Sequence, residues 1–200
     1  MSRTSKTKQS LTSTTSTALP EVKPEKTTAG PVQDFMDTCW DGVTIPVPLM
    51  ALTWAAGSTL ILVNKPPSGL NVYSTLEIFP DSLQEKYKIE IYTSESPTRQ
   101  RFALAHSIAH ILLGHTKSFV DNTHTDSGVD FTNNPKVVSQ INQAANLAAI
   151  EILLPDIILK EKAESGRYPT IESLACQFGV STNTLKFRLN QLGIEPIFHG

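Results

Sequence analysis

Two histidines separated by four positions stand in the apolar stretch RQRFALAHSIAHILLGH, residues 99–115. Residues i and i+4 share one face of an α-helix, so His106 and His110 could direct imidazole nitrogens at a single zinc ion. In the H-E-x-x-H arrangement a glutamate follows the first histidine and takes a proton from metal-bound water, but here Ser107 follows it. The stretch predicts a metal-binding helix without its usual general base. The alternative is a pair of histidines that only pack and hydrogen-bond inside a core helix.

A zinc site needs further protein ligands, and the residues after His110 offer several. His115 is a poor one on a regular helix, because five residues correspond to about 140° around the axis. It would need a turn at Gly114. The polar segment 116–136 is long enough to be functional or mobile, and its side chains could reach back to the helix. The candidates in that segment are His124, Asp121, Asp126 and Asp130.

Regular elements on both sides must position this helix, which Pro97 suits as a start and Gly114 as an end. Short turns rich in Pro, Gly and Ser favour a small, mainly antiparallel sheet before it. The predicted strands are 59–63, 76–79 and 87–92. A second long helix is predicted over 137–154, where Pro155 ends it.

The C-terminal segment has a helix-turn-helix pattern. Its predicted helices cover 171–177 and 182–192, with Ser181 as the N-cap of the second. Lys186 and Arg188 on that second helix could meet DNA phosphates or bases. The same helix is amphipathic and can pack against a core, so DNA binding is the weaker interpretation.

Composition sets limits on the rest of the chain. The first thirty residues contain thirteen Ser or Thr and few apolar side chains, which predicts a disordered tail. This tail has five basic and two acidic side chains, so the remaining residues carry a net charge of −5 within the chain's total of −2. A mildly acidic body argues against a general nucleic-acid surface.

One segment, residues 43–63, is uncharged and as long as a membrane span. Pro46, Pro48 and Gly57 divide it into a short helix around 49–56 and a strand, so we expect no membrane span. No secretory signal pattern precedes it, which favours a cytoplasmic protein. The two cysteines are too far apart for a zinc ribbon, and we expect buried thiols.

Two sequence motifs together resemble those of the ImmA/IrrE family of metallopeptidases. RQRFALAHSIAHILLGH is similar to the family's R-Q-R-F-x-x-A-H-E-x-x-H-x-x-L. About thirty residues later, NQAANLAAIEILLP is similar to its E-x-x-A-N-x-x-A-x-x-L-L-x-P. The resemblance runs from the strand IEIY to LACQFGVSTNTLKFRLNQLG, roughly residues 85–194.

The resemblance assigns His106 and His110 to the zinc-binding histidines. Ser107 stands where the family has its catalytic glutamate, and Asn142 where it has a glutamate as third ligand. Glu151 cannot substitute, because nine residues from position 142 place it on the opposite side of a helix. Losing a general base typically costs ~10²–10⁴ in rate. The resemblance thus implies a degenerate peptidase with weak zinc binding and weak or absent hydrolysis.

Family members with intact sites are implicated in cutting helix-turn-helix repressors of mobile elements or stress genes. The resemblance therefore implies a regulatory (pseudo)peptidase whose partner is an HTH-type repressor or antitoxin. An active zinc endopeptidase with a replacement ligand from segment 116–136 is the alternative, and an HTH DNA-binding regulator is the second alternative.

These observations predict an α+β fold in three parts. Residues 1–30 form a disordered tail. Residues 31–165 form an ImmA/IrrE-like metallopeptidase domain, in which a small antiparallel sheet packs against zincin-like motif helices. Residues 166–200 form a C-terminal helix-turn-helix-like segment.

Overall fold

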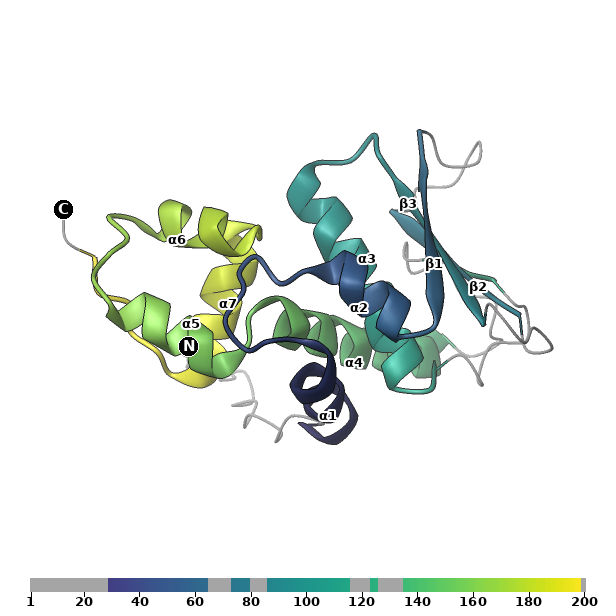
Figure 1. The fold of residues 1–200 in the computed structure, drawn as a ribbon, viewed down its shortest axis with the longest axis horizontal. Helices are drawn as coiled ribbons and strands as arrows, with labels where there is room; N and C mark the ends of the chain where they lie inside the picture. The colour runs from purple at the N-terminus through teal and green to yellow at the C-terminus, as the bar shows by residue number, and fades with distance from the viewer. Residues whose placement is uncertain (1–28, 65–72, 80–85, 116–122, 126–134, 199–200) are drawn as a thin grey trace, which may run out of the picture.

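The computed structural model describes residues 29–64, 73–79, 86–115, 123–125 and 135–198. Residues 1–28 of the predicted tail lie outside this range, as does most of segment 116–136. The chain has the predicted α+β fold, with a sheet at one end and the C-terminal helices at the other (Figure 1).

Four strands form one mixed sheet in the order β1-β3-β2-β4. They are β1 (Ser58–Val63), β2 (Ser74–Ile78), β3 (Tyr87–Tyr92) and β4 (Thr123–Thr125). β2 pairs antiparallel with β3, as predicted, and also with β4, which was not predicted as a strand, but β1 pairs parallel with β3. The antiparallel prediction is wrong for that one pair. A meander would place β1 beside β2, whereas here β3 lies between them.

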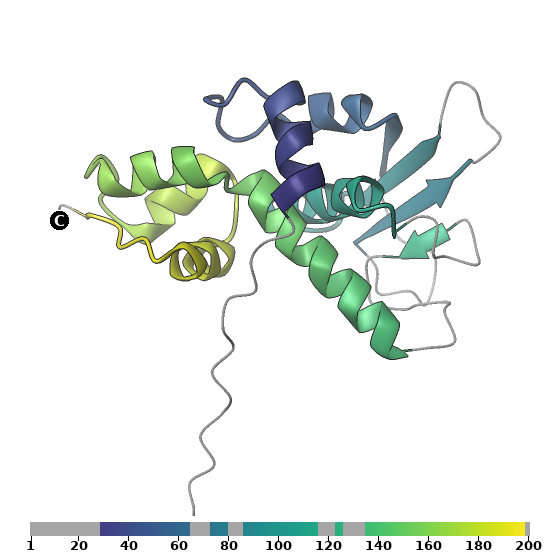
Figure 2. The ribbon, with the colours of Figure 1, turned by 90° about the horizontal axis from the view of Figure 1, so that it is seen from below.

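Helices cover one face of this sheet. α1 (Ala29–Cys39), α2 (Leu49–Ala55) and α3 (Pro97–Leu112) pack together, and α3 contacts both β2 and β3. α4 (Pro135–Leu153) packs along α3 and also contacts α1 (Figure 2). On the opposite face Lys88 forms ion pairs with Glu77 and Glu90. Apolar side chains thus face the helices, and charged ones face away from them.

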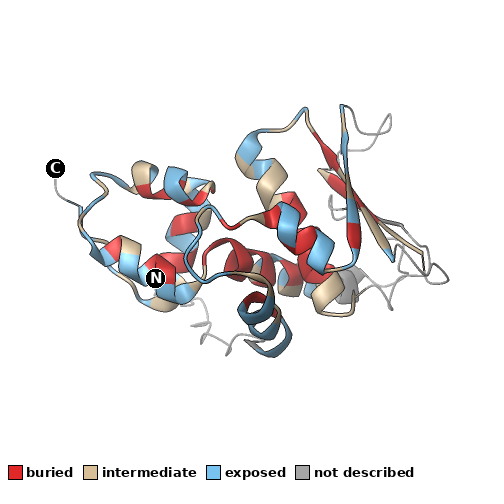
Figure 3. Cartoon of the chain, in the orientation of Figure 1, coloured by how far each residue is buried: buried red, intermediate tan, exposed pale blue. Residues whose placement is uncertain are grey.

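Small side chains allow α3 and α4 to approach closely. Ala105 and Ala109 of α3 and Ala145 and Ala149 of α4 are completely buried. The buried residues form a continuous core between the sheet and these helices (Figure 3). The close approach brings polar side chains of α3 within hydrogen-bonding reach of α4.

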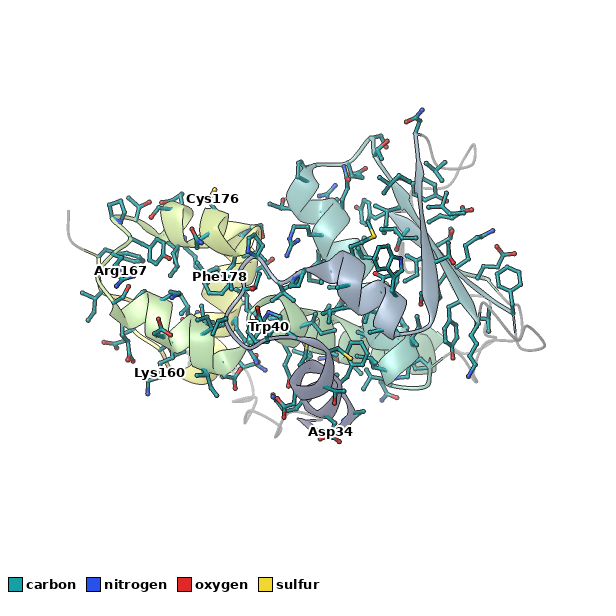
Figure 4. All side chains as sticks on the ribbon, viewed as in Figure 1. Asp34, Trp40, Lys160, Arg167, Cys176 and Phe178 are labelled. Atoms are coloured by element: carbon teal, nitrogen blue, oxygen red, sulfur yellow. The ribbon has the colours of Figure 1, made fainter. Side chains whose placement is uncertain are left out.

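Three helices form a separate group at the end of α4. They are α5 (Asp156–Glu164), α6 (Ile171–Phe178) and α7 (Thr182–Leu192). Ser181 caps α7 as predicted, and Gly179 ends α6 with φ of 66°, a left-handed conformation that glycine adopts without strain. Phe178 is completely buried and points into this group (Figure 4). α5 was not predicted, because Pro155, which ends α4, also serves as the N-cap of a new helix.

Arg188 of α7 lies at the junction between this group and α4, with 1% of its surface exposed. Its guanidinium donates to the Leu154 carbonyl at 3.4 Å, to Gln191 Oε1 at 2.6 Å and to Asp156 Oδ1. The expectation that Arg188 could meet DNA is therefore wrong, because its donors are used inside the protein. Lys186 on the same helix is exposed.

Two further expectations concern the cysteines and the uncharged segment. Cys39 is partly buried and Cys176 is exposed, so the expectation of two buried thiols is wrong for Cys176. Among the described residues no single helix is long and apolar enough to cross a membrane. Residues 139–153 of α4 together with α5 have the length and composition of a membrane span, but the two helices are bent by 55° relative to each other.

Candidate functional site

The two motif histidines lie on the buried side of α3. Pro97 begins the helix, and its regular turns place His106 and His110 one above the other. They are 3% and 0% exposed. Their Nε2 atoms are 2.8 Å apart, so one ring donates a hydrogen bond to the other. The predicted pair therefore shares one face and converges at the Nε2 atoms.

The other ring nitrogens have partners as well. His106 Nδ1 lies 2.8 Å from Asn146 Oδ1 of α4, and His110 Nδ1 lies 3.1 Å from Nδ1 of His115. His115 reaches this position because Gly114 adopts a φ of 68° after the helix. Because Asn146 Oδ1 can only accept, His106 donates a hydrogen bond to Asn146. His110 then donates to His106, and His115 donates to His110. Three neutral imidazoles can make all the hydrogen bonds of this series.

The sequence predicts that His115 is a poor metal ligand on a regular helix. The turn at Gly114 brings it beside His110, but on the Nδ1 side, away from His106. The three rings therefore lie in series and do not surround one point. Burial lowers the pKa of His115, and repulsion from His106 whenever that ring is protonated lowers it further. A lowered pKa favours the neutral ring that the hydrogen-bond chain requires.

Ser107 faces a different direction from the histidines. It is 2% exposed, and its hydroxyl lies 3.2 Å from the hydroxyl of Ser74 in β2. The side chain is thus held against the sheet. Neither serine lines the cavity beside His106. A group in this position exchanges a hydrogen bond with another hydroxyl and has no basic atom to offer a substrate.

Asn142 stands on α4 one turn before Asn146, and both line a cavity with His106. Its Oδ1 atom is buried and has no hydrogen-bond partner among the described residues. The structure thus brings Asn142 to the same cavity as the first histidine. His110 does not line this cavity.

The candidates in segment 116–136 contribute little that can be described. His124 lies in β4, opposite Leu76 of β2, and Asp121, Asp126 and Asp130 lie outside the described residues. Within the described part of the chain, no group of three or more His, Cys, Asp or Glu side chains could hold a metal ion.

Comparison with known proteins decides the family. The sequence profile of the peptidase M78 family, described as the IrrE N-terminal-like domain, matches residues 63–190. The chain belongs to this family. The ImmA/IrrE resemblance of the two motifs is thereby confirmed.

A solved structure of a Mycobacterium tuberculosis transcriptional regulator has a similar fold, with a TM-score of 0.51 and 20% sequence identity. The similarity covers 80% of this ImmA/IrrE-like chain and 45% of the mycobacterial chain, so the chain spans less than half of that protein. No curated protein matches the sequence.

Peptidases of the M78 family depend on zinc in general, so the site can be tested against that ion. Two nitrogens bound to a tetrahedral zinc at 2.0–2.1 Å lie about 3.3 Å apart. The Nε2 atoms of His106 and His110 are 2.8 Å apart in a hydrogen bond. At the positions that the motif resemblance assigns to the third ligand and the general base, this chain has the neutral amide of Asn142 and the hydroxyl of Ser107. This donor set does not fit the family's catalytic zinc.

The cavity beside His106 has a volume of about 670 Å³ and lies between α3, α4 and the start of α7. Two of its lining residues, Arg99 and Tyr73, were not predicted as site residues. The Arg99 guanidinium lies 4.7 Å from the centre of the Tyr73 ring and 3.0 Å from a Glu95 oxygen. Arg99 stands in the RQRF motif, so the sequence contained a signal for it. No acidic residue lines the described cavity.

Glu151 lies outside this cavity, near Arg188 and Asp156, which agrees with its exclusion as a ligand. It is 8% exposed, and its Oε2 atom has no hydrogen-bond partner among the described residues. Burial raises the pKa of Glu151, and the charge of Arg188 opposes this only in part.

A raised folded-state pKa gives Glu151 a pH-dependent effect on stability. The folded protein binds the proton more tightly than the unfolded chain, so stability is lost as pH rises through the folded-state pKa. Glu151→Gln, which stays neutral, should therefore unfold at a higher temperature than wild type at pH 7.5, with a smaller difference at pH 4. Thermal unfolding at both pH values measures this. A variant less stable at pH 7.5 would show that the pairing with Arg188 outweighs the burial.

Proposed function

We propose that this chain is a regulatory ImmA/IrrE-like protein with a degenerate peptidase site. It binds an HTH-type repressor or an antitoxin and controls genes of a mobile element or a stress response in the cytoplasm. It holds its partner and cuts it weakly or not at all. Zinc binds weakly, and DNA is not its direct ligand.

The observation that carries this proposal is the environment of Ser107. A serine hydroxyl does not take protons at neutral pH, and this one is buried and hydrogen-bonded to Ser74. Among the described residues, no carboxylate lines the cavity beside His106. Asn142 adds a neutral oxygen where the family has a carboxylate, so the loss of the base coincides with the loss of a charged ligand.

The cavity supports binding without cleavage. Its lining combines the aromatic rings of Tyr73 and Phe102 with amide and hydroxyl groups and one cation, Arg99. Such a surface can hydrogen-bond an extended peptide segment and pack its apolar side chains. The side-chain amide of Asn142, which also lines the cavity, adds hydrogen-bonding capacity for the backbone of that segment.

The test uses an HTH-type repressor from the same genome, mixed with the purified protein and zinc. We expect a complex by calorimetry and intact repressor by mass spectrometry. Arg99→Ala should weaken the complex by about tenfold, because it removes a cation from the cavity. Lys160→Ala, an exposed change on α5, should leave binding unchanged.

Two results would contradict the proposal. The first is the absence of any complex with the repressor. The second is complete repressor cleavage that disappears in a His110→Ala variant, because it would show a fully active peptidase. Repressor fragments that persist in His110→Ala would instead come from a contaminating protease, and the variant is then used for the binding measurement.

A further inference from the structure

β1 is the last strand on one side of the sheet. It pairs with β3 along one edge, and no described strand pairs with its other edge. A free edge presents backbone N–H and C=O groups that another extended strand can bond. Natural edge strands are commonly protected by lysine, proline or a bulge. The β1 sequence STLILV contains no charged residue and no proline.

Apolar side chains are exposed along this edge. In β1, Ile61 and Leu62 are 40% and 62% exposed. A tight turn at Gly57 connects α2 to β1 (Figure 1). In α2, Met50 and Trp54 are 46% and 68% exposed. Met50 and Leu62 line one shared apolar groove of about 410 Å³. Exposed apolar patches of this kind mark interaction surfaces.

We propose that the β1 edge binds β1 of a second copy of the chain. The two strands pair antiparallel across a two-fold axis and join two sheets into one. This interface is separate from the cavity beside His106, because no β1 residue lines that cavity.

The β1 sequence is complementary to itself in this arrangement. A two-fold axis perpendicular to the sheet leaves each face of β1 on the same side of the joined sheet. Because side chains alternate between the two faces, a residue of one copy can stand opposite only those residues of the other copy whose numbers differ from its own by an even number. With the axis at Ile61, that residue faces its copy. Leu60 then faces Leu62 of the second copy, and Thr59 faces Val63. Every cross-strand pair is apolar or β-branched, which are pairings that stabilise sheets.

Charge also favours a second copy as the occupant. Residues 43–63 carry no charged side chain. Arg101, the one charged residue among the described residues that line the groove, is partly buried, and its guanidinium donates to the Val47 carbonyl at 3.0 Å. A matching strand must be extended, uncharged and apolar on both faces, as β1 itself is. The same axis keeps both α2 helices on one face of the joined sheet, where Met50 lines the groove with Leu62 and Trp54 follows Met50 by one helical turn. Buried tryptophans often contribute strongly to interfaces.

Analytical ultracentrifugation of the full chain over a range of concentrations tests the proposal. We expect a monomer–dimer equilibrium. Leu62→Lys should raise the dimer dissociation constant by about tenfold or more, because the charge meets Leu60 of the second copy twice per dimer. Ile157→Lys is the matched control, since Ile157 is 87% exposed on α5. It should leave the equilibrium unchanged. Both positions are exposed, and thermal unfolding verifies that the variants fold.

Cross-linking tests the register. Directly opposite residues in antiparallel strands have Cα atoms about 4.5–5.5 Å apart, within the range of a disulfide. In a Cys176→Ser background, Ile61→Cys should form a covalent dimer on oxidation, whereas Ile157→Cys should not. Three results would overturn the proposal: a wild-type monomer, a dimer unaffected by Leu62→Lys, or no cross-link at position 61.

Discussion

Replacing Arg188 by methionine is expected to lower the free energy of unfolding by about 3 kcal/mol, because it breaks a buried charged network and leaves partners unpaired. The methionine keeps the apolar stem but loses the hydrogen bonds to the Leu154 carbonyl, Gln191 and Asp156. Glu151 then stays buried without its neighbouring cation. We place the cost at the lower end of the usual range because the Asp156 side chain is 58% exposed. Chemical denaturation measures this loss.

Lys186→Met is the matched control, because it removes a cation from an exposed position of the same helix. It should change stability by less than about 0.5 kcal/mol. Equal, small effects of both changes would show that Arg188 is not structural, and would reopen its role in DNA contact. Duplex DNA binding that is lost only in Lys186→Met would contradict the proposal that DNA is not a direct ligand.

The double variant Ser107→Glu with Asn142→Glu is expected to bind zinc at least about 100-fold more tightly than wild type, because a charged ligand joins two histidines already on one face. Asn142→Glu alone should give much of this affinity, and Ser107→Glu alone little. Only the double variant should gain hydrolysis, since only it has both a held ion and a base. Calorimetric zinc titration of all four proteins measures the affinities.

The position of Ser107 sets the control for this experiment. A glutamate there must displace the contact with Ser74, so each variant's fold is checked by circular dichroism before titration. Ser107→Gln introduces a side chain of nearly the same size as glutamate but without its charge, so it separates steric from electrostatic effects. Equal, weak affinity in all the proteins would mean that His106 and His110 never hold a common ion.

The motif helices could be predicted from the sequence because their signals are local. Pro97 and Ser181 mark helix starts, and the i, i+4 spacing of the histidines fixes their shared face. Family resemblance then located Asn142 on the neighbouring helix. Its presence in the same cavity as His106 agrees with that placement.

Other features depend on tertiary contacts that local patterns do not carry. β3 lies between β1 and β2, which depends on how the chain crosses the sheet and not on the strands' own sequences. His115 reaches His110 because of the left-handed turn at Gly114. Arg188 is buried because Asp156 and the end of α4 supply its partners, and a helical pattern shows an arginine only as polar.

Zinc content of the purified wild-type protein tests the degenerate site most directly. Two histidines that already satisfy each other, with a neutral amide as the third donor, should hold zinc weakly. After dialysis against a mild chelator, mass spectrometry of the metal should find well under one zinc ion per chain. One tightly held ion per chain would contradict the account, and would indicate a ligand from segment 116–136, with His124 and Asp121 the first to replace by alanine.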